Sequence, residues 1–211
     1  MINLVGGGPI YSEWFQTLPK DGQWVGVDRG TVFLLEHGLH VDHAFGDFDS
    51  VSPSEKELIL QKVSTVHEEP PEKDATDMEL ALQWAFTQYE EVRMIGVTGG
   101  RLDHFFGNIQ LLLSDSALNH GYPVCIEDEK NKITCHLPGR MTVEKNAQFP
   151  YLSFIPFTQS VKGLTLTGVK YPLSNHEITY GMTLTLSNEI LENFASISFC
   201  EGILMMIRSR D

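Results

Sequence analysis

The sequence predicts two domains: a doubly wound α/β domain with a mostly parallel sheet over residues 1–128, and an all-β sandwich or barrel over residues 129–211. Three observations lead to this prediction. Short apolar runs alternate with helical patterns in the first part, a period of two replaces that alternation in the second, and a polar stretch separates them. Strands that alternate with helices are typical of a parallel sheet covered by helices, which binds its ligands beyond the carboxyl ends of the strands.

The expected strands of the first part are short apolar runs, typical of buried strands. They span residues 2–7, 24–28, 43–47, 64–68, 92–99 and 122–127. The clearest helical pattern, DATDMELALQWAF at 74–86, has its apolar positions at i, i+3, i+4 and i+7: Met78, Ala81, Leu82 and Ala85. A second helix is expected over 101–118, with an apolar face formed by Leu102, Phe105, Phe106, Ile109 and Leu113.

The second part alternates apolar residues with Thr and Ser. This period of two predicts strands at 164–168, 182–188 and 195–207, and no helical pattern follows residue 130. The expected junction is EDEKNKITCHLPGR at 127–140, where Pro138 and Gly139 signal a turn.

Composition narrows the class of protein. The net charge of −13 argues against a nucleic-acid interface and against binding to an anionic membrane surface. The apolar start of the chain is too short for a signal peptide, and no run approaches the length of a membrane span. Cys125, Cys135 and Cys200 are odd in number and widely spaced, which is typical of reduced thiols. We therefore expect a cytoplasmic protein.

Two carboxylates lie close together in GDFDS at 46–50. If the strand geometry continues through this motif, Asp47 and Asp49 face the same side, where a divalent cation would remove their repulsion. Alternatively, they form a polar turn that caps the helix starting near Ser54.

A third carboxylate follows in KDATDMEL at 73–80. Asp74 and Asp77 share a face at the start of a helix, where Asp74 as N-cap and Asp77 in the first turn would be a sufficient structural explanation. Delivered to the same sheet edge, however, Asp77 would complete a magnesium site, and Lys73 would meet a phosphate.

A glycine-rich loop precedes the second helix, in GVTGGRLDHFFGN at 96–108. Glycines between a strand and a helix let backbone N–H groups approach a phosphate, and the forked cation of Arg101 suits phosphate oxygens. His104 and Asn108 fall opposite the apolar stripe, either toward a ligand or on a solvated face. With Asp28 at the end of another strand, an acidic metal cluster beside an anion cradle predicts phosphoryl transfer from a nucleotide.

These motifs resemble those of the thiamin pyrophosphokinase (thiamine diphosphokinase) family. GDFDS, KDATDMEL and GGRLDH occur in order, before an all-β tail with LSNE at 186–189 and SFCEGILMMI at 198–207. The resemblance covers essentially the whole chain. It implies a nucleotide-binding α/β domain, a thiamin-binding β-sandwich and a homodimer with active sites near the interface. It further implies Mg²⁺-dependent transfer of pyrophosphate from ATP to the thiamin hydroxyl, giving thiamin diphosphate and AMP.

The resemblance also implies roles for individual residues. The catalytic and metal-binding residues would be Asp47, Asp49 and Asp77. The residues around the nucleotide would be Asp28, Lys73, Arg101, Asp103 and His104. The thiamin pocket would include Ser187, Asn188 and Ser198.

Two rival functions remain at this point. A magnesium-dependent phosphohydrolase also uses an Asp-x-Asp motif, although the glycine and arginine cradle and the β tail do not fit it. A thiamin- or nucleotide-binding sensor without turnover would not require three converging carboxylates.

Overall fold

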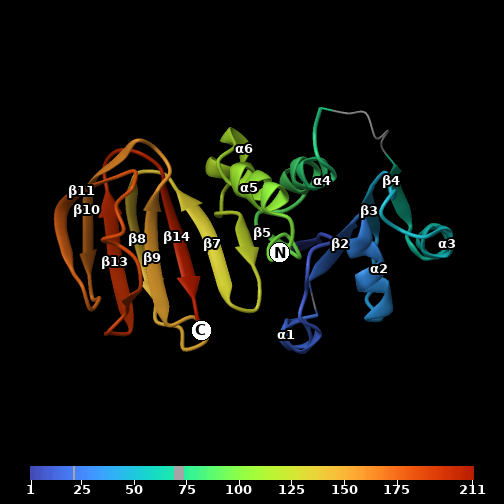
Figure 1. Ribbon diagram of the computed structural model, residues 1–211, viewed down its shortest axis with the longest axis horizontal. Helices are drawn as coiled ribbons and strands as arrows, with labels where there is room; N and C mark the ends of the chain where they lie inside the picture. Colours follow the sequence, from blue (N-terminus) through green and yellow to red (C-terminus); the bar gives the residue numbers. More distant parts are fainter. Residues whose placement is uncertain (21, 69–73) are drawn as a thin grey trace. The chain divides into compact units, whose positions relative to one another are not determined.

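The computed structural model describes residues 1–20, 22–68 and 74–211, which form two compact units, Met1–Glu129 and Lys130–Asp211 (Figure 1). The first unit is α/β and the second is all-β, so the predicted fold class is confirmed. In the described residues, no helix combines the length and apolar character that crossing a bilayer requires.

The sheet of the first unit is parallel, in the order β6-β5-β1-β2-β3-β4. Its strands are β1 (Ile2–Val5), β2 (Gln23–Val27), β3 (His43–Gly46), β4 (Thr65–Glu68), β5 (Val92–Ile95) and β6 (Cys125–Glu127). Each of these strands overlaps a predicted apolar run. The run 92–99 forms a strand only to Ile95 and continues as a loop. The chain passes outward from β1 to β4 and returns to β5 on the other side of β1, so the direction of winding reverses there.

The helices of this unit connect the strands. They are α1 (Ser12–Thr17), α2 (Arg29–Glu36), α3 (Pro53–Lys62), α4 (Asp77–Phe86), α5 (Leu102–Leu111) and α6 (Asp115–Leu118). The helix predicted at 101–118 is two helices, because the Ser114 side chain accepts the Ala117 N–H and caps a new start. Helix α3 begins with a capping box, in which Ser52 and Glu55 satisfy each other's backbone N–H groups.

Helix α4 buries its predicted apolar face: Met78, Ala81, Leu82 and Ala85 are all buried. Helix α5 differs from the prediction. It buries Ile109, and its C-cap Leu112 is also buried, whereas Leu102 is 71% and Phe106 59% exposed. The buried part of α5 is therefore at its C-terminal end, and its first turn is exposed.

The second unit is a sandwich of two antiparallel sheets. One sheet has the order β12-β9-β14-β7, formed by β12 (Asn188–Glu189), β9 (Tyr151–Pro156), β14 (Leu204–Ser209) and β7 (Asn131–His136). The other has the order β11-β10-β13-β8, formed by β11 (Leu173–Thr179), β10 (Ser160–Thr167), β13 (Phe194–Phe199) and β8 (Gly139–Glu144). Phe154 and Leu204 of the first sheet and Ile197 and Leu164 of the second belong to one buried core.

Three segments of the second unit differ from the prediction. The single strand predicted at 195–207 is two strands, β13 and β14, separated by residues 200–203. The polar junction contains β7, whose three consecutive residues Ile133, Thr134 and Cys135 are buried. The strand predicted at 182–188 is mostly turn and extends only over Asn188–Glu189. The buried Thr185 hydroxyl donates to the Phe154 carbonyl at 2.6 Å, and Ser187 has a φ of 53°, so the regular alternation of a strand ends before this point.

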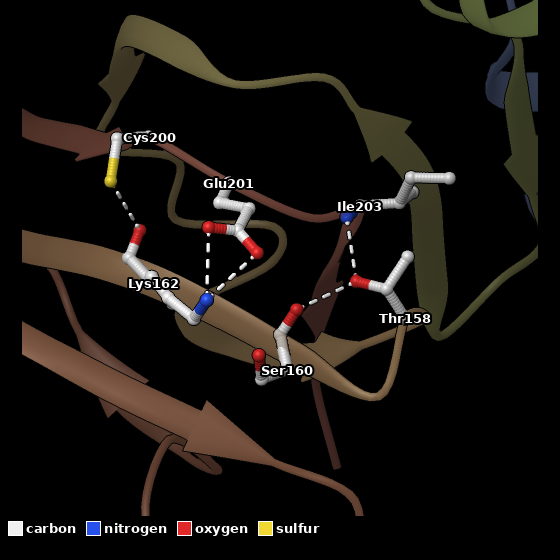
Figure 2. Close-up of polar contacts among 6 residues, drawn as sticks. All are labelled: Thr158, Ser160, Lys162, Cys200, Glu201 and Ile203. Atoms are coloured by element: carbon white, nitrogen blue, oxygen red, sulfur yellow. Dashed lines mark hydrogen bonds and ion pairs between the residues drawn. The ribbon is translucent and has the colours of Figure 1, made fainter.

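Polar contacts fix the turn that follows β13 (Figure 2). The Thr158 hydroxyl donates to the Ser160 carbonyl at 2.8 Å and accepts the Ile203 N–H at 3.0 Å. The Lys162 ammonium binds both oxygens of Glu201, at 2.9 and 3.0 Å. All these groups find partners within the unit, so we interpret this cluster as structural.

Candidate active site

Three carboxylates meet at the carboxyl edge of the parallel sheet. Asp28 directly follows β2, Asp47 directly follows the neighbouring β3, and Asp77 is the first residue of α4. One oxygen of each lies within 4.8 Å of the others, and all three residues are half-buried. Like charges at this separation repel, and a cation among them reverses the balance. We call this group the carboxylate trio.

A glycine gives Asp28 its place in the trio. Gly46 has a φ of 151°, and a Cβ at this position would overlap Oδ1 of Asp28. Asp28 itself has a φ of 48°, a conformation that costs a non-glycine residue on the order of 1–3 kcal/mol. Its backbone N–H donates to the Phe45 carbonyl at 2.8 Å, which ties the end of β2 to β3. The strained backbone of Asp28 and the absence of a side chain at Gly46 thus both lie where the carboxylates meet.

The motif GDFDS does not present both of its carboxylates to the same point. The strand ends at Gly46, and the buried Phe48 has a φ of 57°, so the alternation expected of an extended chain stops. Asp47 accepts the backbone N–H of Asp49 at 3.0 Å, while Asp49 is exposed and does not belong to the trio. A role for Asp49 in catalysis or metal binding stays a prediction.

Capping does not account for Asp77. The N-cap of α4 is Thr76, whose side chain accepts the Glu79 N–H at 3.2 Å, whereas Asp74 is exposed. Asp77 is therefore placed by the helix start but not used as its cap. Lys73 lies outside the described residues.

The glycine-rich loop after β5 packs against the loop after β1. Gly96 has a φ of 67° and Gly99 a φ of 73°, both in the region that favours glycine. The Gly8 N–H donates to the Gly96 carbonyl at 2.8 Å, and a Cβ at Gly8 would lie only 2.6 Å from that oxygen. Two backbones thus approach closely at the point where the strand order reverses.

Arg101 and Asp103 form a fork-to-fork pair at the start of α5. Arg101 Nε and Nη2 lie 3.1 and 2.6 Å from the two Asp103 oxygens, and both side chains are exposed. The hydrogen bonds from Arg101 and from the His104 backbone N–H lower the pKa of Asp103 to about 2. The pair is therefore charged at any physiological pH. His104 is exposed, with its backbone engaged in this pair.

The three residues expected near thiamin are a loop residue, Ser187, and two strand residues on different sheets, Asn188 on β12 and Ser198 on β13. Ser187 is exposed, and its N–H donates to Ser153 Oγ at 2.9 Å. Asn188 is 3% exposed, and its amide binds both the N–H and the carbonyl of Tyr171, at 3.0 and 2.9 Å. Ser198 lies on β13, in register with Thr165 of β10.

The trio fits a hard divalent cation. Mg²⁺ prefers oxygen ligands, and the trio offers carboxylate oxygens from three separate segments. Gly46 has no side chain, which leaves room for the Asp28 carboxylate. Sequence reasoning assigned Asp28 only to the nucleotide. Asp28 and Asp47 each directly follow an apolar run that predicts a strand. This shared position was the feature of the sequence that could have placed Asp28 with the metal-binding carboxylates.

Comparison with known proteins points to one family. The chain matches the family model described as thiamin pyrophosphokinase, catalytic domain, over residues 15–126, and the vitamin B1 binding domain of the same enzyme over residues 140–204. It is 43% identical to the thiamine pyrophosphokinase of Bacillus subtilis, covering 100% of this chain and 99% of that protein.

Solved structures agree with this match. The crystal structure of the Bacillus subtilis thiamine pyrophosphokinase superimposes with a TM-score of 0.88, covering 100% of this chain and 99% of that one. That of the Geobacillus thermodenitrificans thiamin pyrophosphokinase is 46% identical, with a TM-score of 0.88 and 100% and 97% coverage. The yeast thiamin pyrophosphokinase is 14% identical, with a TM-score of 0.80 over 99% and 86% of the chains, and shares the fold.

Proposed function

The chain belongs to the thiamin pyrophosphokinase family, and we propose that its carboxylate trio is the Mg²⁺ site at which pyrophosphate passes from ATP to thiamin. The protein is a thiamine diphosphokinase, a transferase that uses ATP. The rival assignments, a phosphohydrolase and a sensor without turnover, are not favoured by a relative of 43% identity over the whole chain.

The trio would hold the metal through Asp28, Asp47 and Asp77. Bound there, Mg²⁺ would neutralise charge on the phosphates of ATP. The single observation that supports this proposal is the approach of the three half-buried carboxylates to within 4.8 Å at the carboxyl edge of a parallel sheet. We propose Asp49 as a further acidic residue at the reacting phosphates.

The nucleotide would bind along the glycine-rich loop and the start of α5. Backbone N–H groups of a loop rich in glycine approach phosphate oxygens closely, and the Arg101 fork supplies positive charge. Asp103 orients that fork through two hydrogen bonds. Lys73 and His104 complete the set of residues that we propose around the nucleotide.

The chemistry requires positioning more than covalent assistance. The hydroxyl oxygen of thiamin forms a bond to the β-phosphorus of ATP, the bond from that phosphorus to the oxygen bridging to the α-phosphorus breaks, and AMP leaves. The hydroxyl proton passes to a carboxylate at the site, acting as general base. The net charge of −13 favours the approach of thiamin, whose thiazolium ring is cationic.

We propose that the all-β domain, residues 129–211, provides the thiamin pocket, with Ser187, Asn188 and Ser198 contributing to it. The α/β domain, residues 1–128, would carry the nucleotide and the catalytic residues. We further propose a cytoplasmic homodimer with its active sites near the subunit interface. The buried amide of Asn188 binds Tyr171 on both backbone groups, so its contribution would be to hold the chain there in place.

The test is a turnover assay on the purified full chain with ATP, Mg²⁺ and thiamin, following AMP and thiamin diphosphate. Asp47→Asn keeps the size of the side chain but removes its charge, and we expect it to lower kcat by at least about a hundredfold. Asp115→Asn, an exposed Asp in the first turn of α6, is the matched control and should retain full activity.

Three results would contradict the proposal. Near-full activity of Asp47→Asn would remove Asp47 from the metal site. Phosphate release from ATP without thiamin would indicate a hydrolase. Tight thiamin binding without formation of AMP would indicate a sensor.

A further inference from the structure

Asp128 lies beside the glycine-rich loop, although it belongs to a different strand connection. It directly follows β6, the strand that pairs with β5, so the loop after β5 and the residue after β6 emerge at the same sheet edge. The Thr98 hydroxyl donates to Oδ2 of Asp128 at 2.6 Å. This length is typical of a hydroxyl bound to a carboxylate, which is stronger than a bond between neutral groups.

Two further hydrogen bonds hold the residues before Thr98. The Asn108 side-chain amide on α5 donates to the Val97 carbonyl at 3.2 Å. The Gly96 carbonyl accepts the Gly8 N–H at 2.8 Å from the loop after β1. Three consecutive residues of the loop, 96 to 98, are therefore each bound to a different element of the α/β unit.

The loop between Thr98 and Arg101 is less constrained by packing. Gly99 has a φ of 73°, and Gly99 and Gly100 are both exposed, with nothing nearer than the ring of Pro9 to a Cβ built on either. A pair of exposed glycines has a large conformational entropy. The conformation of Gly99 and Gly100 therefore depends on how firmly the preceding residue, Thr98, is held.

We propose that Asp128 is a positioning residue for the reaction: through Thr98 it holds the glycine-rich loop, residues 96–100, in the conformation that receives the phosphates of the nucleotide. The inference rests on the proposed function, because it takes this loop as the nucleotide site. In this proposal Asp128 acts on the loop through Thr98.

The experiment measures the affinity of the full-length protein for a non-hydrolysable ATP analogue with Mg²⁺, together with the KM values for ATP and thiamin. Asp128→Ala removes the acceptor, and Thr98→Val removes the donor at nearly constant volume. We expect either change to weaken nucleotide binding about tenfold, which is the size of one lost charge-assisted hydrogen bond. The KM for thiamin should stay unchanged.

Two controls separate positioning from general stability. Asp128→Asn keeps an oxygen that accepts the Thr98 hydroxyl, and it should recover most of the nucleotide affinity. The double variant Asp128→Ala with Thr98→Val should lose no more affinity than either single variant, because both remove the same bond. If Asp128→Ala does not fold, Thr98→Val alone carries the test.

Arg101→Ala distinguishes this inference from the proposed nucleotide site. Weaker binding in Arg101→Ala but not in Thr98→Val or Asp128→Ala would overturn the inference and leave the site in place. Unchanged binding in all three would overturn both. Equal losses in nucleotide affinity, thiamin KM and thermal stability would reduce Asp128 to a structural residue.

Discussion

Polar side chains withdrawn from solvent are arranged in opposite ways in the two units. At the edge of the α/β sheet, Asp28, Asp47 and Asp77 bring like charges within 4.8 Å of one another. In the all-β unit, the buried Asn188 and Thr185 hydrogen-bond backbone groups of neighbouring segments. The first arrangement is unfavourable unless a cation joins it, whereas the second is complete within the chain. The half-buried, mutually repelling carboxylates therefore indicate a ligand, whereas the buried and fully hydrogen-bonded Asn188 and Thr185 indicate a structural role.

The largest effect should separate the trio from its exposed neighbour. Asp28→Asn removes a charge from the trio, and we expect kcat to fall by at least about a hundredfold. Asp49→Asn, outside the trio, should lower kcat by less than Asp28→Asn does. Steady-state kinetics on both variants checks this order, and a larger loss in Asp49→Asn would show that the motif GDFDS acts through its second carboxylate.

The geometry that gathers the trio provides the next test. In Gly46→Ala, the new Cβ would overlap Oδ1 of Asp28, so that carboxylate must move, and we expect kcat to fall by roughly tenfold or more. Gly107→Ala on α5 is the matched control, because a Cβ there meets nothing within 4 Å. Equal activity in the two variants would mean that the position of Asp28 is unimportant.

A loss of stability rather than of chemistry is expected in the all-β unit. Asn188→Ala removes the buried amide that binds both the N–H and the carbonyl of Tyr171, which should lower the free energy of unfolding by about 2 kcal/mol. Nucleotide affinity should be unaffected. Urea unfolding measures the change, with the exposed turn variant Asn146→Ala as control. A loss of nucleotide affinity in Asn188→Ala at unchanged stability would mean that Asn188 serves ligand binding and not the stability of the all-β unit.

The smallest effect concerns pH. Burial lowers the pKa of His136 to about 4, from 6.5 in the unfolded chain. The unfolded chain then binds more protons between these values, so stability is fully present above about pH 6.5 and is lost as the pH falls toward 4. Because His136 is only partly buried, we expect it to account for on the order of 1 kcal/mol between pH 7 and pH 5.

Replacing His136 tests that assignment. His136→Gln should flatten this part of the pH dependence of urea unfolding, whereas His176→Gln, at an exposed position of β11, should not. An unchanged pH dependence in His136→Gln would assign the acid sensitivity to other groups.

The fold was largely predictable from the sequence because apolar periodicity marks elements that bury a face. The strands of the parallel sheet and the buried face of α4 follow directly from it. Helices α1 and α2 were not predicted, since each is short and α2 starts directly after the strained Asp28. The strand predicted at 182–188 failed because alternation says nothing about hydrogen-bond partners, and Thr185 binds Phe154 instead.

The site was predictable in its residue types but not in its grouping. Asp47 and Asp77 follow from motifs, but the membership of Asp28 depends on β2 lying beside β3, which no local pattern contains. The separation of Asp49 depends on the positive φ of Phe48, a buried aromatic residue that gives no sign of a left-handed backbone. The bond from Thr98 to Asp128 joins residues 30 positions apart and is invisible to local patterns.

The most direct test of the central claim is to locate the metal. Crystals of the full chain grown with Mn²⁺ in place of Mg²⁺ and a non-hydrolysable ATP analogue would show the ion in an anomalous difference map. We predict a peak bound by carboxylate oxygens of Asp28, Asp47 and Asp77. A metal held by Asp49 with the trio turned away, or bound only by the nucleotide, would contradict the assignment.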